Sequence, residues 1–310
     1  MEIRALTQQY ISELCITAQE LGKAVGYSRT TMERYLSGQR TSTELERALA
    51  GYLAERGYLP DAEDEDETAS PAPLPALPEM YPSRDATGVI GLCSQCQDEG
   101  ALGIITAPPG YGKTHALARY GASTAKTAVI YCDDTMGKKD FIRAVERALG
   151  LTRSSGTACE RTDAIVDFFR QQRGWLLIID EADKLISRST IQKMEVVRKL
   201  VDRAPVGVVI AGEPVLEVLL KNYDRRFADR IDLHLELGGL TPKDVQGYLA
   251  GYDVTADAAA ELTRRGCDKS GGCFRRLNRT MRNVLRLLAE RQERRITLPV
   301  ITEASAMMLL

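Results

Sequence analysis

The sequence has no long apolar run, and this absence excludes a membrane-spanning helix. A span needs about 18 consecutive, mostly apolar residues. No stretch of the 310-residue chain approaches that length, although 44% of its residues are hydrophobic. The first residues also lack the apolar core of a secretory signal peptide. We therefore expect a cytoplasmic protein with no membrane partner.

A disulfide framework is also missing. The chain has seven cysteines, an odd number at scattered positions, which is typical of reduced thiols. Cys93 and Cys96 form a single C-x-x-C pair, with no second pair and no histidine near it. This spacing favours buried or incidental cysteines over a metal or redox site.

Neither sign of charge is in large excess, but the charges are unevenly distributed. The net charge is −2, whereas residues 60–85 contain eight acids and one base. Residues 264–295 carry eleven lysines and arginines against three acids. Such local clusters are more informative about partners than the net value is. The length of 310 residues fits about two domains.

Residues 102–114 contain the motif around which the rest of the chain is interpreted. A short apolar run enters a glycine-containing turn, and Gly112, Lys113 and Thr114 then open a predicted helix. This is the layout of a P-loop, in which backbone N–H groups surround the phosphates, the lysine neutralises charge and the hydroxyl ligates Mg²⁺. Ala107 takes the place of the first glycine of the usual motif. The predicted nucleotide-binding residues are Pro109, Gly110, Tyr111, Gly112, Lys113, Thr114 and His115.

A second motif follows about 70 residues after that lysine. Residues 175–179 are wholly apolar and lead into Asp180 and Glu181. Asp180 would hold Mg²⁺ together with Thr114, and Glu181 would act as the general base toward water. A plain acidic residue at a helix start is the alternative for Glu181. The two motifs together predict a chain that binds ATP or GTP with Mg²⁺, and ATP is the cofactor we expect.

Residues 1–59 are predicted to form a small all-α domain. Thr17 and Glu20 have the spacing of a capping box, Gly26 is placed to make a turn, and Ser28 can cap a second helix. This pattern resembles the helix-turn-helix of repressor-type DNA-binding domains, whose second helix enters the major groove. A helical pair used for protein contacts is the alternative. The residues expected to face DNA are Ser28, Arg29, Thr30, Thr31 and Arg34.

The remaining chain separates into three predicted parts. Residues 60–85 are acidic and then proline-rich, so we expect an unfolded linker. In residues 86–239 apolar runs alternate with amphipathic stretches, which predicts an α/β domain with a parallel sheet and flanking helices. Residues 240–310 read as successive helices and should form a helical lid. The strands are expected at 102–106, 127–131, 175–183 and 206–211.

Two ATPase families share these motifs. The motif that begins at Ala107 and the acidic motif at 180–183 resemble those of a DEAD-box helicase. Only 127 residues follow Asp183, however, and they contain neither a second lobe nor the arginine-rich motif of such enzymes. The order of motifs resembles instead the AAA+ ATPases. This resemblance implies an arginine finger that reaches the neighbouring subunit's site, with Arg230 as first choice and Arg226 as second. It also implies that Arg275, in a G-x-x-R motif, touches the γ-phosphate from the lid.

Within the AAA+ proteins, the chain resembles the Mu B-like family of phage transposition proteins over nearly its whole length. The resemblance rests on residues 109–114, 177–183, 227–231 and 272–278 and on the order of the domains. It implies an ATP-dependent homo-oligomer or helical filament on double-stranded DNA with little sequence preference, a cognate transposase as partner, and the bacterial host cytoplasm as location. Hydrolysis would drive disassembly. Glu213 stands where the fourth strand usually ends in a polar sensor, so slow hydrolysis is expected.

Basic residues give separate support for DNA as a partner, because a sequence-tolerant binder aims cations at phosphates. In an AAA+ ring or filament the segments after the second strand and after the second motif face the axis, and the lid has arginines at helical spacing. A solvated helix face is the alternative for the lid. The core set is Lys138, Lys139, Lys184, Arg188, Lys193, Arg198 and Lys199, and the lid set is Arg276, Arg279, Arg282 and Arg286.

Two other functions stay open at this point. One is an AAA+ helicase loader or secretion-type ATPase whose client is another protein. The other is an ATP-switched helix-turn-helix transcriptional regulator. Residues 1–59 carry seven bases and seven acids, which argues against tight DNA binding by that domain alone.

Overall fold

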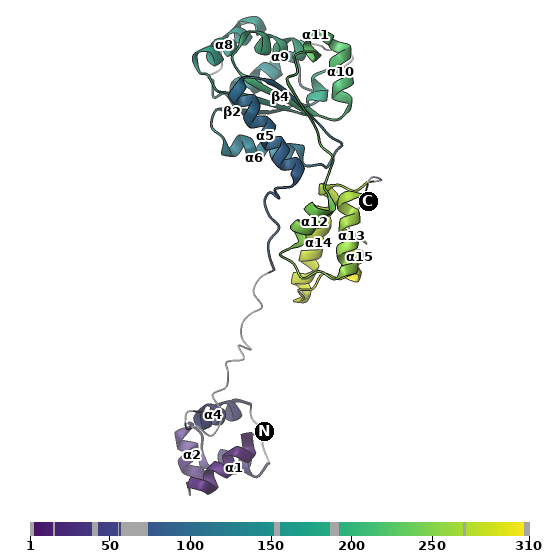
Figure 1. Ribbon diagram of the computed structural model, residues 1–310. Coiled ribbons are helices and arrows are strands. Elements are labelled where there is room, and N and C mark those ends of the chain that lie inside the picture. The colour runs from purple at the N-terminus through teal and green to yellow at the C-terminus, as the bar shows by residue number, and fades with distance from the viewer. Residues whose placement is uncertain are drawn as a thin grey trace. The chain divides into compact units, whose positions relative to one another are not determined.

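The computed structural model describes residues 3–14, 16–38, 43–54, 56, 74–151, 156–186, 192–268 and 271–306. The chain divides into two compact units, Met1–Ala72 and Pro73–Leu310. Figure 1 shows the helices and strands of both units. No helix within the described ranges has both the length and the apolar character needed to cross a membrane.

The described residues of the first unit form four short helices around one small core. These are α1 (Ile3–Leu14), α2 (Ala18–Ala24), α3 (Arg29–Leu36) and α4 (Thr43–Ala54). Each helix is too short to be stable in water alone, so the shared apolar core must hold the unit together. That core contains Leu6, Tyr10, Leu21, Met32, Tyr35, Leu45, Leu49 and Leu53.

The turn between α2 and α3 has the local structure that its sequence predicts. The Thr17 side chain accepts a hydrogen bond from the Glu20 amide, and the Glu20 carboxylate accepts one from the Thr17 amide. Gly26 has φ +77°, a value that glycine adopts without strain. The Ser28 side chain caps α3 by accepting from the Thr31 amide. The predicted capping box, turn and second cap are all confirmed.

The described part of the second unit contains a five-stranded parallel sheet with the order β2-β3-β4-β1-β5. The four predicted strands are confirmed, three of them to within one residue at each end. The third ends at Asp180 and not at residue 183, because the backbone turns left-handed at Glu181. The fifth strand was not predicted, because it is a four-residue edge strand without an apolar run. The strands are β1 (Leu102–Thr106), β2 (Thr127–Tyr131), β3 (Leu176–Asp180), β4 (Gly207–Gly212) and β5 (Leu233–Glu236).

Helices cover both faces of the sheet (Figure 1). On one face α5 (Arg84–Glu99) and α6 (Lys113–Ser123) pack on the strands. Cys93 and Cys96 lie on the buried face of α5, and burial raises the pKa of each thiol to about 12, as expected of packing residues. The opposite face carries α7 (Lys138–Ala148), α8 (Ala158–Gln171), α9 (Gln192–Arg203) and α10 (Val215–Tyr223).

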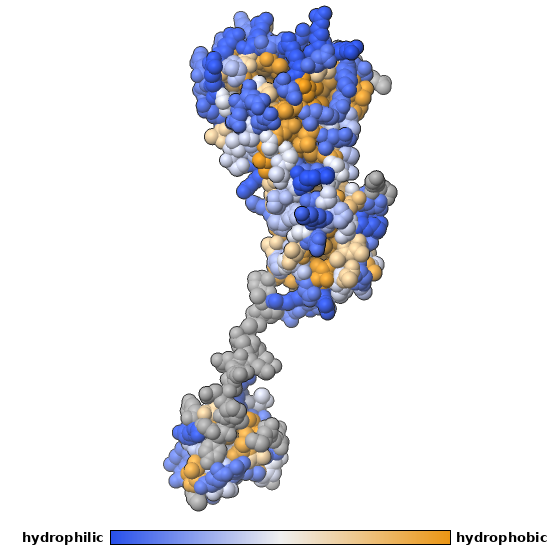
Figure 2. Space-filling view, viewed as in Figure 1, coloured by the Kyte–Doolittle hydropathy of each residue, from blue (hydrophilic) through white to orange (hydrophobic). Residues whose placement is uncertain are grey.

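The last part of the chain is the helical lid, which has an apolar core of its own. The 3₁₀-helix η1 (Ala182–Leu185) follows β3, and the short α11 (Arg225–Ala228) follows α10. Figure 2 shows hydrophilic side chains over much of the visible surface of the second unit, interrupted by smaller apolar areas. The lid helices are α12 (Pro242–Leu249), α13 (Ala256–Cys267), α14 (Phe274–Arg291) and α15 (Leu298–Ala306).

Residues 74–83 are not the free linker that the sequence predicts, and we call them the strap. Leu74, Leu77 and Tyr81 pack against the lid core, and the Tyr252 hydroxyl donates to the Ala76 carbonyl at 3.2 Å. Prolines keep the segment extended, but its spaced apolar side chains gain from burial. The linker prediction for 60–85 is therefore wrong over its last part, where α5 has already begun. Residues 57–73 lie outside the described residues.

Candidate nucleotide site

The turn between β1 and α6 is shaped by two glycines with left-handed backbone. Gly110 has φ +89° and Gly112 has φ +93°, a region that L side chains disfavour. A Cβ on Gly110 would also meet Cys273 Sγ at 2.9 Å. Gly112 caps α6 without a side-chain hydrogen bond. The first amides of α6 can therefore bind an anion, as a phosphate site requires.

Lys113 is the buried cation of this turn. Its side chain is among the buried polar groups, at 8% exposure, and Nζ donates to the Ala107 carbonyl at 2.5 Å and to the Pro108 carbonyl at 3.3 Å. Burial lowers the pKa of Lys113, while the neighbouring carboxylates, Asp180 first, oppose that effect. The ammonium is thus held at the turn by carbonyl bonds, which phosphate oxygens can replace.

Asp180 ends β3 and is completely buried. Its Oδ1 accepts from the Glu181 amide at 2.9 Å, whereas its Oδ2 has no hydrogen-bond partner among the described residues. A buried carboxylate oxygen without a partner is costly and suits a cation. Thr114, on the first turn of α6, lines the adjoining pocket. These two residues would hold Mg²⁺, which would supply charge neutralisation to the phosphates.

Glu181 follows with a left-handed backbone, φ +55° and ψ +39°. Among the described residues only Lys126 and Gln292 are other non-glycine positions with positive φ. Burial, and then Asp180 and Asp183, raises the pKa of Glu181. A strained backbone and a raised pKa in a pocket are characteristic of a functional carboxylate. Glu181 is therefore suited to take a proton from water.

The end of β4 brings a second glutamate to the same pocket. Glu213 lines it together with Lys113 and Glu181. The Glu213 amide donates to Asp183 Oδ1 at 3.2 Å, and a Cβ on Gly212 would meet that oxygen at 2.7 Å. Asp183 thus fixes the backbone at the strand end. Glu213, which replaces the usual polar sensor, therefore lines the nucleotide pocket.

The lid closes the pocket from the other side. The Arg275 amide donates to the Gly110 carbonyl at 3.0 Å, so the start of α14 lies directly against the glycine turn. Arg275 and Asn278 line the pocket, and the Tyr248 hydroxyl donates to Asn278 Oδ1 at 2.9 Å. Arg275 therefore lies in the wall of the pocket, where its guanidinium can balance phosphate charge.

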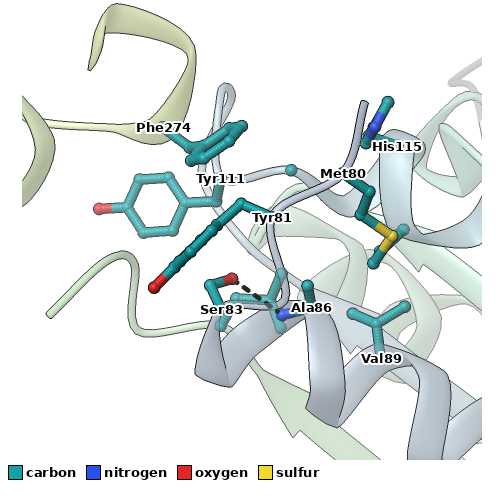
Figure 3. A pocket seen from close by; sticks show the side chains of 11 residues that line it. Met80, Tyr81, Ser83, Ala86, Val89, Tyr111, His115 and Phe274 are labelled. Carbon is teal, nitrogen blue, oxygen red and sulfur yellow. Dashed lines mark hydrogen bonds between the residues drawn. The ribbon is translucent and has the colours of Figure 1, made fainter. Parts of the chain in front are cut away.

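An apolar compartment adjoins the phosphate pocket. Figure 3 shows Met80 and Tyr81 of the strap, Tyr111 of the glycine turn and Phe274 of α14 around it, with His115 at its edge. Aromatic and aliphatic walls beside a phosphate site suit a nucleotide base. The sequence interpretation missed Met80 and Tyr81, because it assigned them to an unfolded linker. The other lining residues are Ser83, Ala86, Val89, Gly112, Ala116 and Leu237.

The strap connects the core to the lid across this compartment. On the core side, His115 Nε2 is hydrogen-bonded to the Glu79 carbonyl at 2.5 Å. On the lid side, the Tyr81 ring meets the Tyr248 ring edge-on, with centroids 5.4 Å apart, and Gly247 leaves room for the Tyr81 hydroxyl. The strap is therefore a structural wall of the site.

Comparisons with known proteins agree with this geometry. Residues 96–220 match the family model described as AAA domain. The core has the fold of an AAA+ P-loop ATPase. ATP with Mg²⁺ fits the glycine turn, Lys113 and the unpartnered Asp180 oxygen of this fold. A comparison with curated proteins found no match.

Several solved structures share the fold of the AAA+ domain and lid. The Aeropyrum pernix ORC2 protein is 15% identical with a TM-score of 0.57, over 72% of this chain and 66% of that one. Cdc6p from Pyrobaculum aerophilum is 14% identical, also at 0.57, over 78% and 70%. The Aeropyrum pernix ORC1 protein in complex with DNA is 17% identical at 0.54, over 74% and 66%. The chain thus spans about two thirds of the ORC proteins' length, and the likeness shows the fold.

The predicted arginine fingers lie outside the pocket of their own AAA+ domain. Arg230 forms an ion pair with Asp202 of α9, which Arg198 also approaches at 3.8 Å. The Arg226 amide donates to Asp224 at 2.9 Å, and its guanidinium has no ion pair within the described ranges. A role in a neighbouring subunit stays a prediction for both arginines.

The assignment of one residue in the predicted DNA-binding core set is wrong. Lys193 is 2% exposed, and its Nζ donates to the Lys184 carbonyl at 2.5 Å, because α9 packs this side chain beneath η1. Other members are paired with acids: Lys184 with Asp183 at 3.3 Å and Lys199 with Asp163 at 2.7 Å. Lys138 is half-buried, Lys139 is exposed and Arg188 lies outside the described residues.

In the helical unit, the predicted DNA-facing residues lie on the outer side of α3 and on its cap. Thr31 is half-buried, and Arg29 is paired with Glu33 at 2.7 Å. Such an exposed pair is weak, so Arg29 stays available to phosphate or base. DNA contact by this face stays a prediction. The exposed members are Ser28, Arg29, Thr30 and Arg34.

Proposed function

We propose that this chain is an ATP-dependent DNA-binding protein that assembles with copies of itself on double-stranded DNA, delivers that DNA to a transposase and stimulates strand transfer. The observation that carries the ATP-dependent part is the pocket itself. It brings together Lys113 and the strained Glu181 from the core with Arg275 from the lid. Asp180, whose charge acts on Lys113, has one oxygen without a partner beside it. The transposition part rests on the resemblance of the sequence to the Mu B-like family.

The chemistry of turnover follows from the positions of these side chains. Lys113 and Arg275 bind and orient the phosphates from opposite sides of the pocket. Glu181, whose pKa is raised, accepts a proton from the attacking water. An arginine from the next subunit completes the charge balance. Turnover then weakens the assembly and releases it from DNA.

DNA as the partner has two supports of different kinds. A solved structure of the same fold, the Aeropyrum pernix ORC1 protein, is in complex with DNA. In this chain, exposed arginines of α14 and the outer face of α3 offer cations to phosphates. Sequence-tolerant binding needs contacts to phosphate more than to base edges.

A second candidate is an ATP-switched transcriptional regulator. The observation in its favour is α3, which has a formed cap and an exposed polar face as a recognition helix requires. A regulator of this kind would give a defined footprint on one operator that survives loss of nucleotide. The transposition proposal expects binding to arbitrary duplexes that requires ATP.

The deciding experiment is binding of the full chain to an arbitrary duplex, followed by fluorescence anisotropy with and without ATP and Mg²⁺. Binding should require ATP, and its affinity should fall steeply as salt rises. Electron microscopy of the same mixture should show oligomers or filaments along the DNA. The absence of DNA binding at low salt would refute the proposal. Rings that form without DNA, with DNA-independent turnover, would indicate a protein client instead.

A further inference from the structure

The outer face of α14 carries a line of arginines that begins at the nucleotide pocket. Arg275, Arg279, Arg282 and Arg286 are spaced four, three and four residues apart and are all exposed. This spacing places them on one face of a helix. The line extends about 16 Å along the helix axis. We call Arg279, Arg282 and Arg286 the lid stripe, because Arg275 already belongs to the pocket.

The charges of the lid stripe are mostly not neutralised. Arg279 and Arg282 have no ion pair with any acid in the part of the chain that the structure describes. Arg286 pairs with Glu290 of its own helix at 3.3 Å, and both side chains are more than half exposed, so the pair contributes little. Arg276, grouped with them from the sequence, is half-buried with its Nε enclosed and does not belong to the stripe.

The cations of the core offer a weaker surface. Lys184 and Lys199 are held by acids, and Lys193 is buried. The hollow beside Lys138 is also lined by Glu195 and Asp202. A phosphate that approached this surface would meet carboxylates as well as cations, whereas the lid stripe presents arginines with few acids beside them.

From this contrast we propose that the lid stripe is the principal phosphate-contact surface for duplex DNA, rather than the predicted core set. The proposal rests on the proposed function and names its DNA-binding surface. Arginine is well suited to this role, because its planar guanidinium binds phosphate oxygens in pairs. The three arginines of the stripe extend about 10 Å along the helix axis, which spans roughly three phosphates of one strand, at 3.4 Å of axis per phosphate.

The position of the stripe also couples DNA to nucleotide. The amide of Arg275 is bonded to Gly110 of the glycine turn, so ATP bound there fixes the start of the same helix that carries the stripe. Coupling of this kind is reciprocal. Duplex DNA should therefore tighten ATP binding by the same factor as ATP tightens DNA binding.

The test compares two double variants of the full chain with the same change in charge. Arg279→Gln with Arg282→Gln removes two stripe cations, and Lys138→Gln with Lys139→Gln removes two core cations. DNA affinity is measured by anisotropy with an arbitrary duplex, Mg²⁺ and a slowly hydrolysed ATP analogue over a range of salt. The stripe variant should lose affinity roughly ten-fold, and its salt slope should fall by about 1.8. The lysine variant should stay within about two-fold of wild type.

Controls separate this inference from folding and from the proposed function. The stripe variant should keep wild-type ATP affinity without DNA, and Arg279→Lys with Arg282→Lys should restore most of the DNA affinity. Wild-type DNA affinity in the stripe variant, with the lysine variant weakened, would overturn the inference and leave the proposed function standing. No DNA binding by the wild type would defeat the proposed function. Tighter binding of poly-glutamate than of duplex to the stripe would assign it to an acidic protein and also overturn the inference.

Discussion

Lys113 is the residue on which nucleotide binding most depends. Its ammonium is buried and bonded to two P-loop carbonyls, so it is held where the phosphates bind. Lys113→Ala should weaken ATP binding by roughly 1.5–3 kcal/mol, the range for hydrogen bonds to charged groups. Calorimetric titration with MgATP measures this loss, with Lys139→Ala, an exposed lysine, as control. Equal affinity of both variants would show that the lysine does not bind phosphate.

Glu181 makes turnover depend on pH in a direction that can be stated. Burial, and then Asp180 and Asp183, raises its pKa, and a general base works only when deprotonated. Turnover should therefore fall, as the pH drops, at a higher pH than the ordinary glutamate value of about 4.3. The pH profile of kcat tests this. Glu181→Gln should lower kcat by about 10²–10⁴-fold and keep ATP and DNA binding. A variant with unchanged kcat would show that another residue is the general base.

Glu213 should weaken the binding of ATP relative to ADP. Its carboxylate lines the pocket with Lys113, whose ammonium reaches the outer phosphates, and like charges repel. Glu213→Gln should strengthen the binding of ATP by about 0.5–1 kcal/mol and that of ADP by less, and the rate of turnover should rise. Glu79→Gln is the matched control, since that carboxylate also lines the pocket but is 96% exposed. Equal tightening of ATP and ADP would contradict this role.

At the scale of single residues, the sequence predicts best what a local motif determines. Lys113, Thr114, Asp180 and Glu181 could be identified because their spacing from a strand end determines where they lie. Lys193 could not be judged, because its burial depends on how α9 packs against η1. The capping residues of α2 and α3 were predictable for the same reason as the motif: each bond spans only three residues.

Among the elements, the strap makes the most specific prediction. Tyr81 lines the base compartment and packs on Tyr248 of the lid. Tyr81→Ala should lower the free energy of unfolding by about 1–3 kcal/mol, because it removes a half-buried ring, and should weaken ATP binding. Thermal melts with and without MgATP measure both effects. Tyr131→Ala is the control, since that ring is 48% exposed on β2; equal effects of the two variants would refute the assigned role of the strap.

The elements also show where sequence patterns stop being informative. The four predicted strands were recognisable from their apolar runs, and β1, β3 and β4 are buried at every position, as such runs indicate. The edge strand β5 alternates between half-buried and exposed residues over only four positions, which is too short for a periodic signal. The prolines of the strap led to its interpretation as a spacer. Its packing could not be predicted, because the lid surface that it contacts comes more than 160 residues later in the chain.

At the scale of the whole molecule, we propose that a second chain completes the site, and the ion pairs favour one of the two candidate fingers. Arg230 is already paired with Asp202, whereas Arg226 has no ion pair in the described residues. The Arg230 pair is half exposed and therefore weak, so either arginine can reach a neighbour, and we propose Arg226 as the finger because it has no ion pair to break. Arg226→Ala should abolish turnover and keep ATP binding, because a finger acts on the transition state and not on ground-state affinity.

Mixing variants tests whether this arginine acts between subunits. Chains with Arg226→Ala keep an intact pocket, and chains with Lys113→Ala keep an intact finger, so each is inactive alone. In an equal mixture with ATP and DNA, an active site forms wherever a Lys113→Ala chain donates Arg226 to an Arg226→Ala neighbour. Random assembly should restore about a quarter of wild-type turnover. Recovery with Arg230→Ala chains in place of Arg226→Ala chains would assign the finger to Arg230, and no recovery with either would mean that the site works within one chain.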